Sequence, residues 1–215
     1  MKRISAAILA TSLFSSGAFA AQYEVTITNL TRGQTFTPIL VASHRPGVSL
    51  FELGESASSE LSALAEGGDI SALSTALHAT GRLIGTGDSG GLLGPGESTV
   101  VSVDAGRHGR AEISLAAMLI PTNDAFISLN AVAAPASHQE FTYFAPVYDA
   151  GSEPNDESCS NIPGPVCGGA GGSPEEGGEG FVHIHAGIHG VGDLDPAIYD
   201  WRNPAARITI RRVRD

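Results

Sequence analysis

The sequence predicts an all-β fold, an antiparallel β-sandwich of about eight strands, from two observations. In residues 23–30, YEVTITNL, the apolar Tyr23, Val25 and Ile27 alternate with polar residues, which is the period of a strand with one buried face. Seven more short runs, rich in β-branched and apolar residues, lie between turn-forming stretches: 37–43, 98–104, 112–120, 126–133, 140–148, 180–186 and 206–213. Many short strands separated by turns favour a sandwich or a barrel.

One or two short helices are expected after the second of these strands. Asp69 stands where it can cap residues 70–79, ISALSTALHA, whose apolar residues recur at helical spacing before Gly81. Residues 58–68, SSELSALAEGG, have the same character and end on glycine, a common helix terminator. We expect both helices to lie on an edge of the sheet. The glycine-rich stretches 85–96 and 164–180 are expected to be loops.

The first 20 residues have the composition of a secretory signal peptide. Two basic residues precede an apolar run over residues 6–14, and the small residues at 18–20 form a cleavage site. The run is shorter than the roughly 20 residues that cross a bilayer as a helix, and no later segment comes close to that length. We therefore expect residues 21–215 to form one exported domain, secreted or periplasmic, that does not span the membrane.

The chain beyond this segment is acidic. Lys2 is the only lysine, so residues 21–215 hold 10 arginines against 23 acids, a formal charge of −13. Nucleic acid is excluded as an expected partner, because binding a polyanion needs a basic face. Seven of the acids fall between Asp149 and Glu179 with no arginine or lysine among them, so this loop should attract cations.

The two cysteines, Cys159 and Cys167, flank a loop that contains proline and glycine. In an exported chain this pattern predicts a disulfide that closes a short surface loop. A redox pair is not expected at this spacing.

The segment GDSGG, residues 87–91, matches the nucleophile segment of trypsin-like proteases and also the G-x-S-x-G pattern. Only ten residues separate Ser89 from His78, the nearest preceding histidine, with no predicted strand between them, whereas a protease of that fold takes the two residues from separate barrels. Ser89 also leads into a loop and not into the helix that a nucleophile elbow requires. We interpret this segment as a flexible loop.

Several short segments, in order, resemble the spondin N-terminal domain found in F-spondin and mindin. They are ASH (42–44), LFELGESAS (50–58), LAEGG (64–68), MLIPTNDAFISLN (118–130), YDAGSE (148–153) and ARITIRRV (206–213). The resemblance implies a secreted antiparallel β-sandwich similar to a C2 domain, with a calcium ion bound in loops at one end. It also implies a role in matrix adhesion or receptor contact.

The candidate calcium ligands are Asp124, Asn130, Asp149 and Glu153. Asp124 lies in the turn before the strand 126–133, and Asp149 and Glu153 lie just past a strand end, where loop carboxylates can converge on one ion. Calcium takes six to eight oxygen ligands, including backbone carbonyls and water. Asp104, at the end of residues 98–104, is a further candidate of lower rank.

The chain departs from the family pattern in three places, two of them at candidate ligands. Asn130 stands where animal members often have aspartate, Glu153 replaces aspartate, and Ala125 replaces a tryptophan. A neutral amide attracts a dication less than a carboxylate does, so the departure at Asn130 weakens the expected site.

Three histidines within seven positions form a second candidate metal site, for zinc or copper. In a strand, His183 and His185 project from one face, and the chain can turn at Gly187 to bring His189 to the same ion. Asp193 or Asp195 could supply oxygens behind the imidazoles. The alternative is that the imidazoles lie on the wet face of a strand and bond to backbone or carboxylates.

Five arginines near the C-terminus offer another choice. Arg202, Arg207, Arg211, Arg212 and Arg214 could bind an anionic partner such as polysaccharide or lipid headgroups. Alternatively, Arg207 and Arg211 pair with acids on the sheet surface, which we favour because charged strands commonly protect sheet edges.

The sequence thus leads to two hypotheses of function. The first is an exported, non-enzymatic, calcium-binding module that recognises a surface or matrix protein or a polysaccharide. The second is a periplasmic zinc or copper protein that uses the three histidines, including a metal-dependent hydrolase or oxidoreductase.

Overall fold

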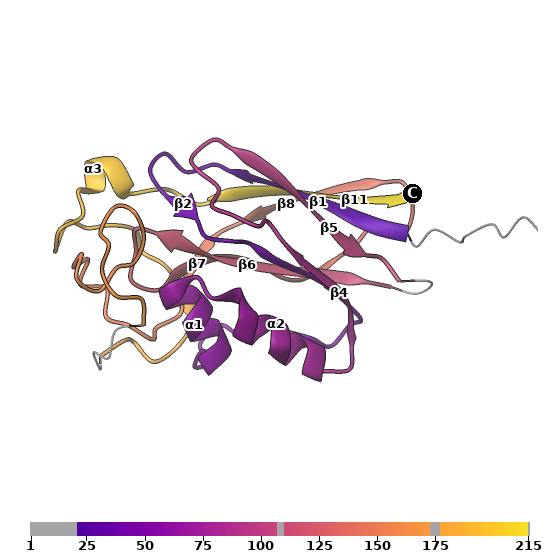
Figure 1. The fold of residues 1–215 in the computed structure, drawn as a ribbon, viewed down its shortest axis with the longest axis horizontal. Coiled ribbons are helices and arrows are strands. Elements are labelled where there is room, and N and C mark those ends of the chain that lie inside the picture. Colours follow the sequence, from indigo (N-terminus) through magenta and orange to yellow (C-terminus); the bar gives the residue numbers. More distant parts are fainter. Residues whose placement is uncertain (1–20, 107–109, 173–176, 215) are drawn as a thin grey trace, which may run out of the picture.

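The computed structural model describes residues 21–106, 110–172 and 177–214, which form two antiparallel sheets packed face to face (Figure 1). The first sheet contains, in spatial order, β5 (Ser98–Asp104), β1 (Ala21–Asn29), β11 (Ala206–Arg214) and β8 (Glu140–Ala145). The second contains β10 (His183–Ile184), β9 (Val147–Asp149), β7 (Ala125–Ala133), β6 (Glu112–Ile120), β3 (Leu40–His44) and β4 (Leu83–Asp88), and β2 (Thr35–Phe36) pairs with β6. The predicted all-β sandwich is confirmed, with 11 strands in place of about eight.

The strand predicted over residues 140–148 is two strands in different sheets. β8 pairs with β11 in the first sheet, whereas β9 pairs with β7 in the second. Pro146 lies between them and has no backbone N–H to donate, so the ladder is interrupted where the chain changes sheets. The strand predicted over residues 180–186 is also wrong in length, because only the two residues of β10 form a strand.

Sequence reasoning missed β4, because its glycines were interpreted as the start of a loop. These glycines allow close approach between the two sheets. A Cβ atom at Gly87 would lie 2.8 Å from the carbonyl oxygen of Ser102 in β5, a distance at which the backbones could not remain in place. The four-residue helix α3 (Pro196–Tyr199) was also not predicted.

The two predicted helices are present as α1 (Ser59–Gly67) and α2 (Ile70–Ala79). The Ser58 hydroxyl accepts the N–H of Leu61, and Asp69 Oδ1 accepts the N–H of Ser71 at 2.8 Å, so each helix has a side-chain N-cap. The expected position at a sheet edge is wrong for α1, which packs over the central strands β6 and β7, while α2 lies near β4. Figure 1 shows both helices covering the outer face of the second sheet.

The core therefore has two layers of apolar side chains. One lies between the sheets and includes Tyr23, Val25 and Ile27, the three residues whose alternation predicted the first strand. The other lies between the second sheet and the helices and includes Leu61, Leu64 and further residues of α1 and α2. Because the second sheet is covered on both faces, β6 is buried along nearly its whole length and shows no alternation.

Long loops follow β9 and β10 at one end of the sandwich, near α3, and the C-terminus lies at the other end (Figure 1). The predicted disulfide between Cys159 and Cys167 is formed within the first loop. The carboxylate of Glu157, also in this loop, is buried and accepts the backbone N–H groups of His189, Gly190 and Val191. These bonds tie the two loops together.

The arginines of β11 include one ion pair on the sheet surface, as favoured from the sequence. Arg211 Nη2 lies 2.5 Å from the Glu24 carboxylate on the neighbouring β1. Arg212 Nη1 instead donates to the carbonyl of Ala136 at 2.8 Å. Among the described residues Arg207 forms no ion pair, so the expectation for that residue is not met.

The GDSGG segment is partly strand and not wholly the loop expected from the sequence, because Gly87 and Asp88 end β4 and the remaining three residues bend away from it. The hydroxyl of Ser89 accepts the N–H of Ile39 and donates to the carbonyl of Gly91, so it stabilises the backbone. His78 lies exposed on α2.

Some of the predicted features lie in parts of the chain that the structure does not describe. The predicted signal peptide lies outside the described residues, as do Glu175 and Glu176 of the acidic loop. Within the described ranges no helix combines the length and the apolar character needed to cross a bilayer.

Candidate metal site

Strand pairing places the candidate site at one end of the second sheet. β9 lies between β7 and β10, and Asp149, its last residue, pairs with Ala125 on one side and with His183 on the other. Asp124 immediately precedes β7, and its carbonyl accepts the N–H of Ala150 at 3.2 Å. Three segments far apart in sequence are thus brought together by the register of short strands.

Two aspartates form the buried part of the site. Asp124 and Asp149 are both 0% exposed. Asp124 Oδ2 accepts the backbone N–H groups of Ser152 at 2.8 Å and Glu153 at 3.0 Å, whereas its Oδ1 is buried without a hydrogen-bond partner among the described residues. Asp149 Oδ1 accepts the N–H of Gly151 at 2.8 Å, and its Oδ2 accepts the side-chain amide of Asn155 at 2.7 Å.

The surroundings of the two carboxylates disfavour their charged forms. Burial, and secondarily the charge of Asp149, raise the pKa of Asp124 to about 7 in spite of its two backbone hydrogen bonds. Burial also raises the pKa of Asp149, against the lowering effect of its bonds to Asn155 and Gly151. Within the described part of the chain no arginine forms an ion pair with either residue. A cation bound here would relieve both desolvation and repulsion.

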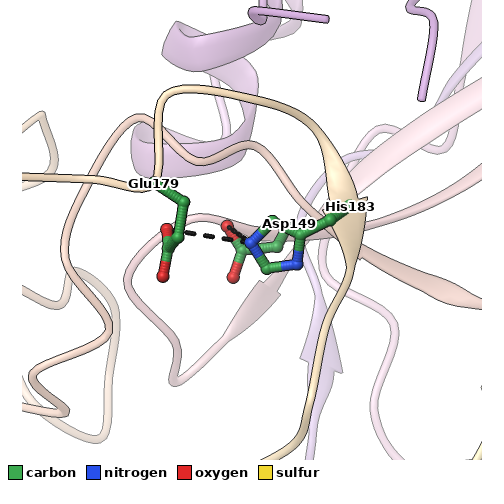
Figure 2. A group of neighbouring side chains, drawn as sticks. All are labelled: Asp149, Glu179 and His183. Carbon is green, nitrogen blue, oxygen red and sulfur yellow. Dashed lines mark ion pairs between the residues drawn. The ribbon is translucent and has the colours of Figure 1, made fainter. Parts of the chain in front are cut away.

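His183 and Glu179 complete a group that could hold an ion (Figure 2). His183 Nε2 lies 3.6 Å from Asp149 Oδ1 and 3.8 Å from Glu179 Oε2. The ligand atoms of these three residues all lie within 4.8 Å of one another, and they are the only such group among the described residues.

The tautomer of His183 suits a ligand. Its Nδ1 lies 3.1 Å from the carbonyl oxygen of Ile184, which can only accept, so Nδ1 carries the hydrogen and the neutral ring keeps its lone pair on Nε2. Burial lowers the pKa of His183, but the bond to Ile184 and the carboxylates of Asp149 and Glu179 outweigh this effect, so the pKa is raised overall. Nε2 therefore takes either a proton or a metal ion.

His185 has a supporting role in this geometry. Its buried ring accepts the N–H of Gly187 at Nδ1, at 2.9 Å, and its Nε2 lies 3.1 Å from Asn155 Oδ1. Nε2 therefore carries the hydrogen. Burial lowers the pKa of His185 to about 4, so the ring is neutral and neither nitrogen has a free lone pair. The ring packs against Trp201 at 5.1 Å between centroids.

The structure does not gather the three predicted imidazoles around one point. His189 is exposed, and the candidate group of Asp149, Glu179 and His183 contains neither His185 nor His189. Of the four predicted calcium ligands, this group contains Asp149 alone. The two aspartates predicted to lie behind the imidazoles are engaged elsewhere. Asp193 Oδ2 accepts the N–H of Cys159, and Asp195 Oδ1 caps α3.

Asn130 is also placed differently from the prediction. It lies further along β7, where its Oδ1 accepts the N–H of Leu50 at 2.8 Å and its Nδ2 donates to the carbonyl of Phe51 at 2.8 Å. The amide thus holds the loop after β3. Asp104, the candidate of lower rank, accepts the N–H of Gly106 at the end of β5.

Glu153 is buried, and its backbone N–H donates to Asp124 Oδ2, but its carboxylate does not belong to the group of Asp149, Glu179 and His183. Two residues of the candidate site, Glu179 and Asn155, were not singled out from the sequence. Asn155 Nδ2 bonds to both Asp149 Oδ2 and Glu179 Oε1, so it connects two of the acids. The only available signal was the general acidity of the loop, which does not specify which acid faces β9.

Comparison with protein families gives one match. The family model described as Spondin_N matches residues 7–154, more than half of the chain. The matched range includes Asp124, Asp149 and Glu153, whereas Glu179 and His183 lie beyond it. Among curated proteins, none matches this chain.

Proposed function

Because this chain belongs to the spondin N-terminal domain family, we propose that it is an exported, non-enzymatic module that binds calcium at Asp124 and Asp149 and recognises a partner at the cell surface or in the extracellular matrix. Family membership and the Cys159–Cys167 disulfide are typical of a protein that works outside the cytoplasm. Calcium is also the ion that the family resemblance implies.

The observation that carries the calcium proposal is the buried Oδ1 of Asp124 beside Asp149, which has no hydrogen-bond partner in the described part of the chain. A buried polar atom without a partner is rare in a folded protein and calls for an ion or a water molecule. Since both residues are carboxylates and no arginine reaches them in the described chain, a cation is the favoured occupant.

The donor set favours a hard cation. Asp149 and Glu179 lie in one group with His183, and Asp124 offers a further buried carboxylate that interacts electrostatically with Asp149. Loop carbonyls and water can complete the six to eight ligands that calcium takes. His183 would either lie in the outer shell or supply one nitrogen. Extracellular calcium modules bind in the region of 10⁻⁴ to 10⁻³ M, so we expect occupancy outside the cell and not in the cytoplasm.

The bound ion would have a structural role. The loop after β9 and the segment before β10 bring Asp149 and Glu179 together, and their negative charges repel each other. An ion between them would fix both loops at this end of the sandwich. The exposed part of these loops is then the surface we propose for recognition of a surface or matrix protein or a polysaccharide.

Thermal melts test this proposal. The chelator-treated chain should melt at a lower temperature than the same sample in millimolar calcium, because an ion that binds only the folded state stabilises it. Equilibrium dialysis followed by elemental analysis should give about one calcium per chain. Asp124→Asn should abolish both effects, whereas Glu140→Gln, which changes an exposed acid at the start of β8, should retain them. Equal melts with and without calcium would reject the proposal.

A second candidate is a zinc or copper site, which the available Nε2 lone pair of His183 favours. One imidazole and two carboxylates form a plausible set of ligands for zinc. Cobalt titration distinguishes the two, because a four-coordinate site of the zinc type absorbs strongly in the visible range, whereas a site with six or more ligands absorbs weakly. His183→Ala should remove that spectrum, while His78→Ala, which changes an exposed histidine on α2, should not.

A further inference from the structure

Three arginines line a groove at the end of the sandwich opposite the metal site. Arg45 follows β3, Arg82 precedes β4 and Arg110 lies two residues before β6. They come together because His44, the last residue of β3, pairs with Leu83 of β4 and with Glu112 of β6. Asp124 lies beyond the other end of β6, whose nine residues span about 30 Å.

The groove has a volume of about 410 Å³ and a lining of one charge sign. Besides the three arginines it is lined by Pro46, Ile84, Ala105 and Ala111, and no acid is among the described residues that line it. In the described residues none of the three guanidinium groups lies within 4.0 Å of a carboxylate oxygen. Two acids lie near Arg110 in sequence, but both have other contacts. Asp104 accepts the N–H of Gly106, and Glu112 lies 3.9 Å from His44.

This arrangement stands out in a chain of formal charge −13 after residue 20, where an arginine should readily find an acid. Arg82 is held in position, because its Nη1 donates to the carbonyl of Pro46 at 2.9 Å and its carbonyl accepts the N–H of Arg45 at 2.9 Å. The side chains of Arg45 and Arg110 make no hydrogen bond within the described residues and remain available to a ligand.

We propose that Arg45, Arg82 and Arg110 form a binding site for one phosphate monoester group on a carrier with an apolar face. Guanidinium groups match phosphate oxygens in pairs, and a monoester carries a charge of about −1.5 to −2 that one arginine cannot balance. The floor of Ile84, Ala105 and Ala111 suits the apolar face of the carrier. The net negative charge of the protein disfavours a long polyanion, which would meet repulsion beyond the groove.

Titration with phenyl phosphate, followed by amide chemical shifts, tests the site. We expect saturable binding with shifts at Ile84 and Ala111, and weaker binding of inorganic phosphate, which lacks the apolar part. Arg45→Gln and Arg110→Gln should each weaken binding about tenfold, as expected for the loss of a charged hydrogen bond. Both residues are exposed, so the variants should fold.

The matched control is Arg207→Gln, which removes the same charge from an exposed arginine on β11 and should leave the affinity unchanged. The titration is repeated in Asp124→Asn with chelator, so that phosphate held by a cation at the other end is excluded and the result does not depend on the proposed calcium site. Absence of saturable binding, or equal weakening by Arg207→Gln, would overturn the proposal. Equal affinity for inorganic phosphate would overturn the role of the apolar floor.

Discussion

Asp124, just before β7, lies beside Asp149, the last residue of the neighbouring β9. Both residues are fully buried, and neither has an arginine partner among the described residues. Asp149 pairs with Ala125, the residue after Asp124, and the backbone bond from Ala150 to the Asp124 carbonyl fixes the relation. Such a pair raises the free energy of the folded chain unless a proton or a cation neutralises it. The pair therefore links the stability of the fold to the occupancy of the site.

The first prediction concerns Asp124→Asn, which keeps the shape of the side chain and removes its charge. In chelator we expect this variant to be more stable than the original chain, because repulsion with Asp149 is lost. The change in the free energy of unfolding should be at most a few kcal/mol, the order that follows from the raised pKa. In saturating calcium the order should reverse. Urea unfolding in chelator and in calcium measures these differences in stability. A variant less stable than the original chain in both conditions would contradict the prediction.

The second prediction concerns pH in the chelated protein. The pKa of Asp124 is raised to about 7 and that of Asp149 is also raised, so the folded state keeps protons that the unfolded chain releases near pH 4. The contribution of these groups is thus fully present below about pH 4 and is lost as the pH rises towards 7.

His185 acts in the opposite direction. Its pKa is lowered to about 4, so its contribution is present above about pH 6.5 and is lost as the pH falls towards 4. Both chains contain His185, so the difference between the original protein and Asp124→Asn isolates the aspartate. We expect the original protein to lose more stability than the variant between pH 5 and 7, whereas parallel pH profiles would count against the assignment.

Local signals in the sequence were sufficient to predict part of the fold. The alternation over residues 23–30 predicted β1, and the helix caps predicted α1 and α2, because each signal is local. Asp124, Asp149 and Glu153 could be proposed because they lie next to strand ends, and the family resemblance selected them from many acids.

The remainder of the site depended on long-range pairing. Asn130 has the same side chain whether it holds a loop or an ion, and only the position of Leu50 and Phe51 decides between them. The register of β10 on β9 selects His183 and leaves His189 exposed, and no local pattern reports that register.

The third prediction follows from the position of Asn130. Asn130→Ala removes the partners of the Leu50 N–H and the Phe51 carbonyl, so we expect the free energy of unfolding to fall by about 1–3 kcal/mol. Calcium affinity should stay within about twofold, because the amide is not near the ion. A calcium titration beside a denaturant curve measures both quantities. Loss of calcium binding with unchanged stability would restore Asn130 as a ligand.

The fourth prediction separates His183 and His185, whose Nε2 atoms lie 3.6 Å and 3.7 Å from the two carboxylate oxygens of Asp149. His185→Ala should destabilise the chain by about 2 kcal/mol or more, because it removes a buried ring from contact with Trp201 and takes away the donor to Asn155 Oδ1. His183→Ala should change stability little in calcium and should weaken zinc binding more than calcium binding. Melts and metal titrations of both variants test the distinction, and it is wrong if the two variants behave alike.

Calorimetric titration of calcium into the chelator-treated protein tests the claim that Asp124 and Asp149 hold a divalent cation. We expect about one calcium per chain, with a dissociation constant near the range of extracellular modules, and no measurable binding to Asp124→Asn. No heat of binding to the original chain, or equal binding by the variant, would contradict the claim and leave the two buried carboxylates to be neutralised by protons.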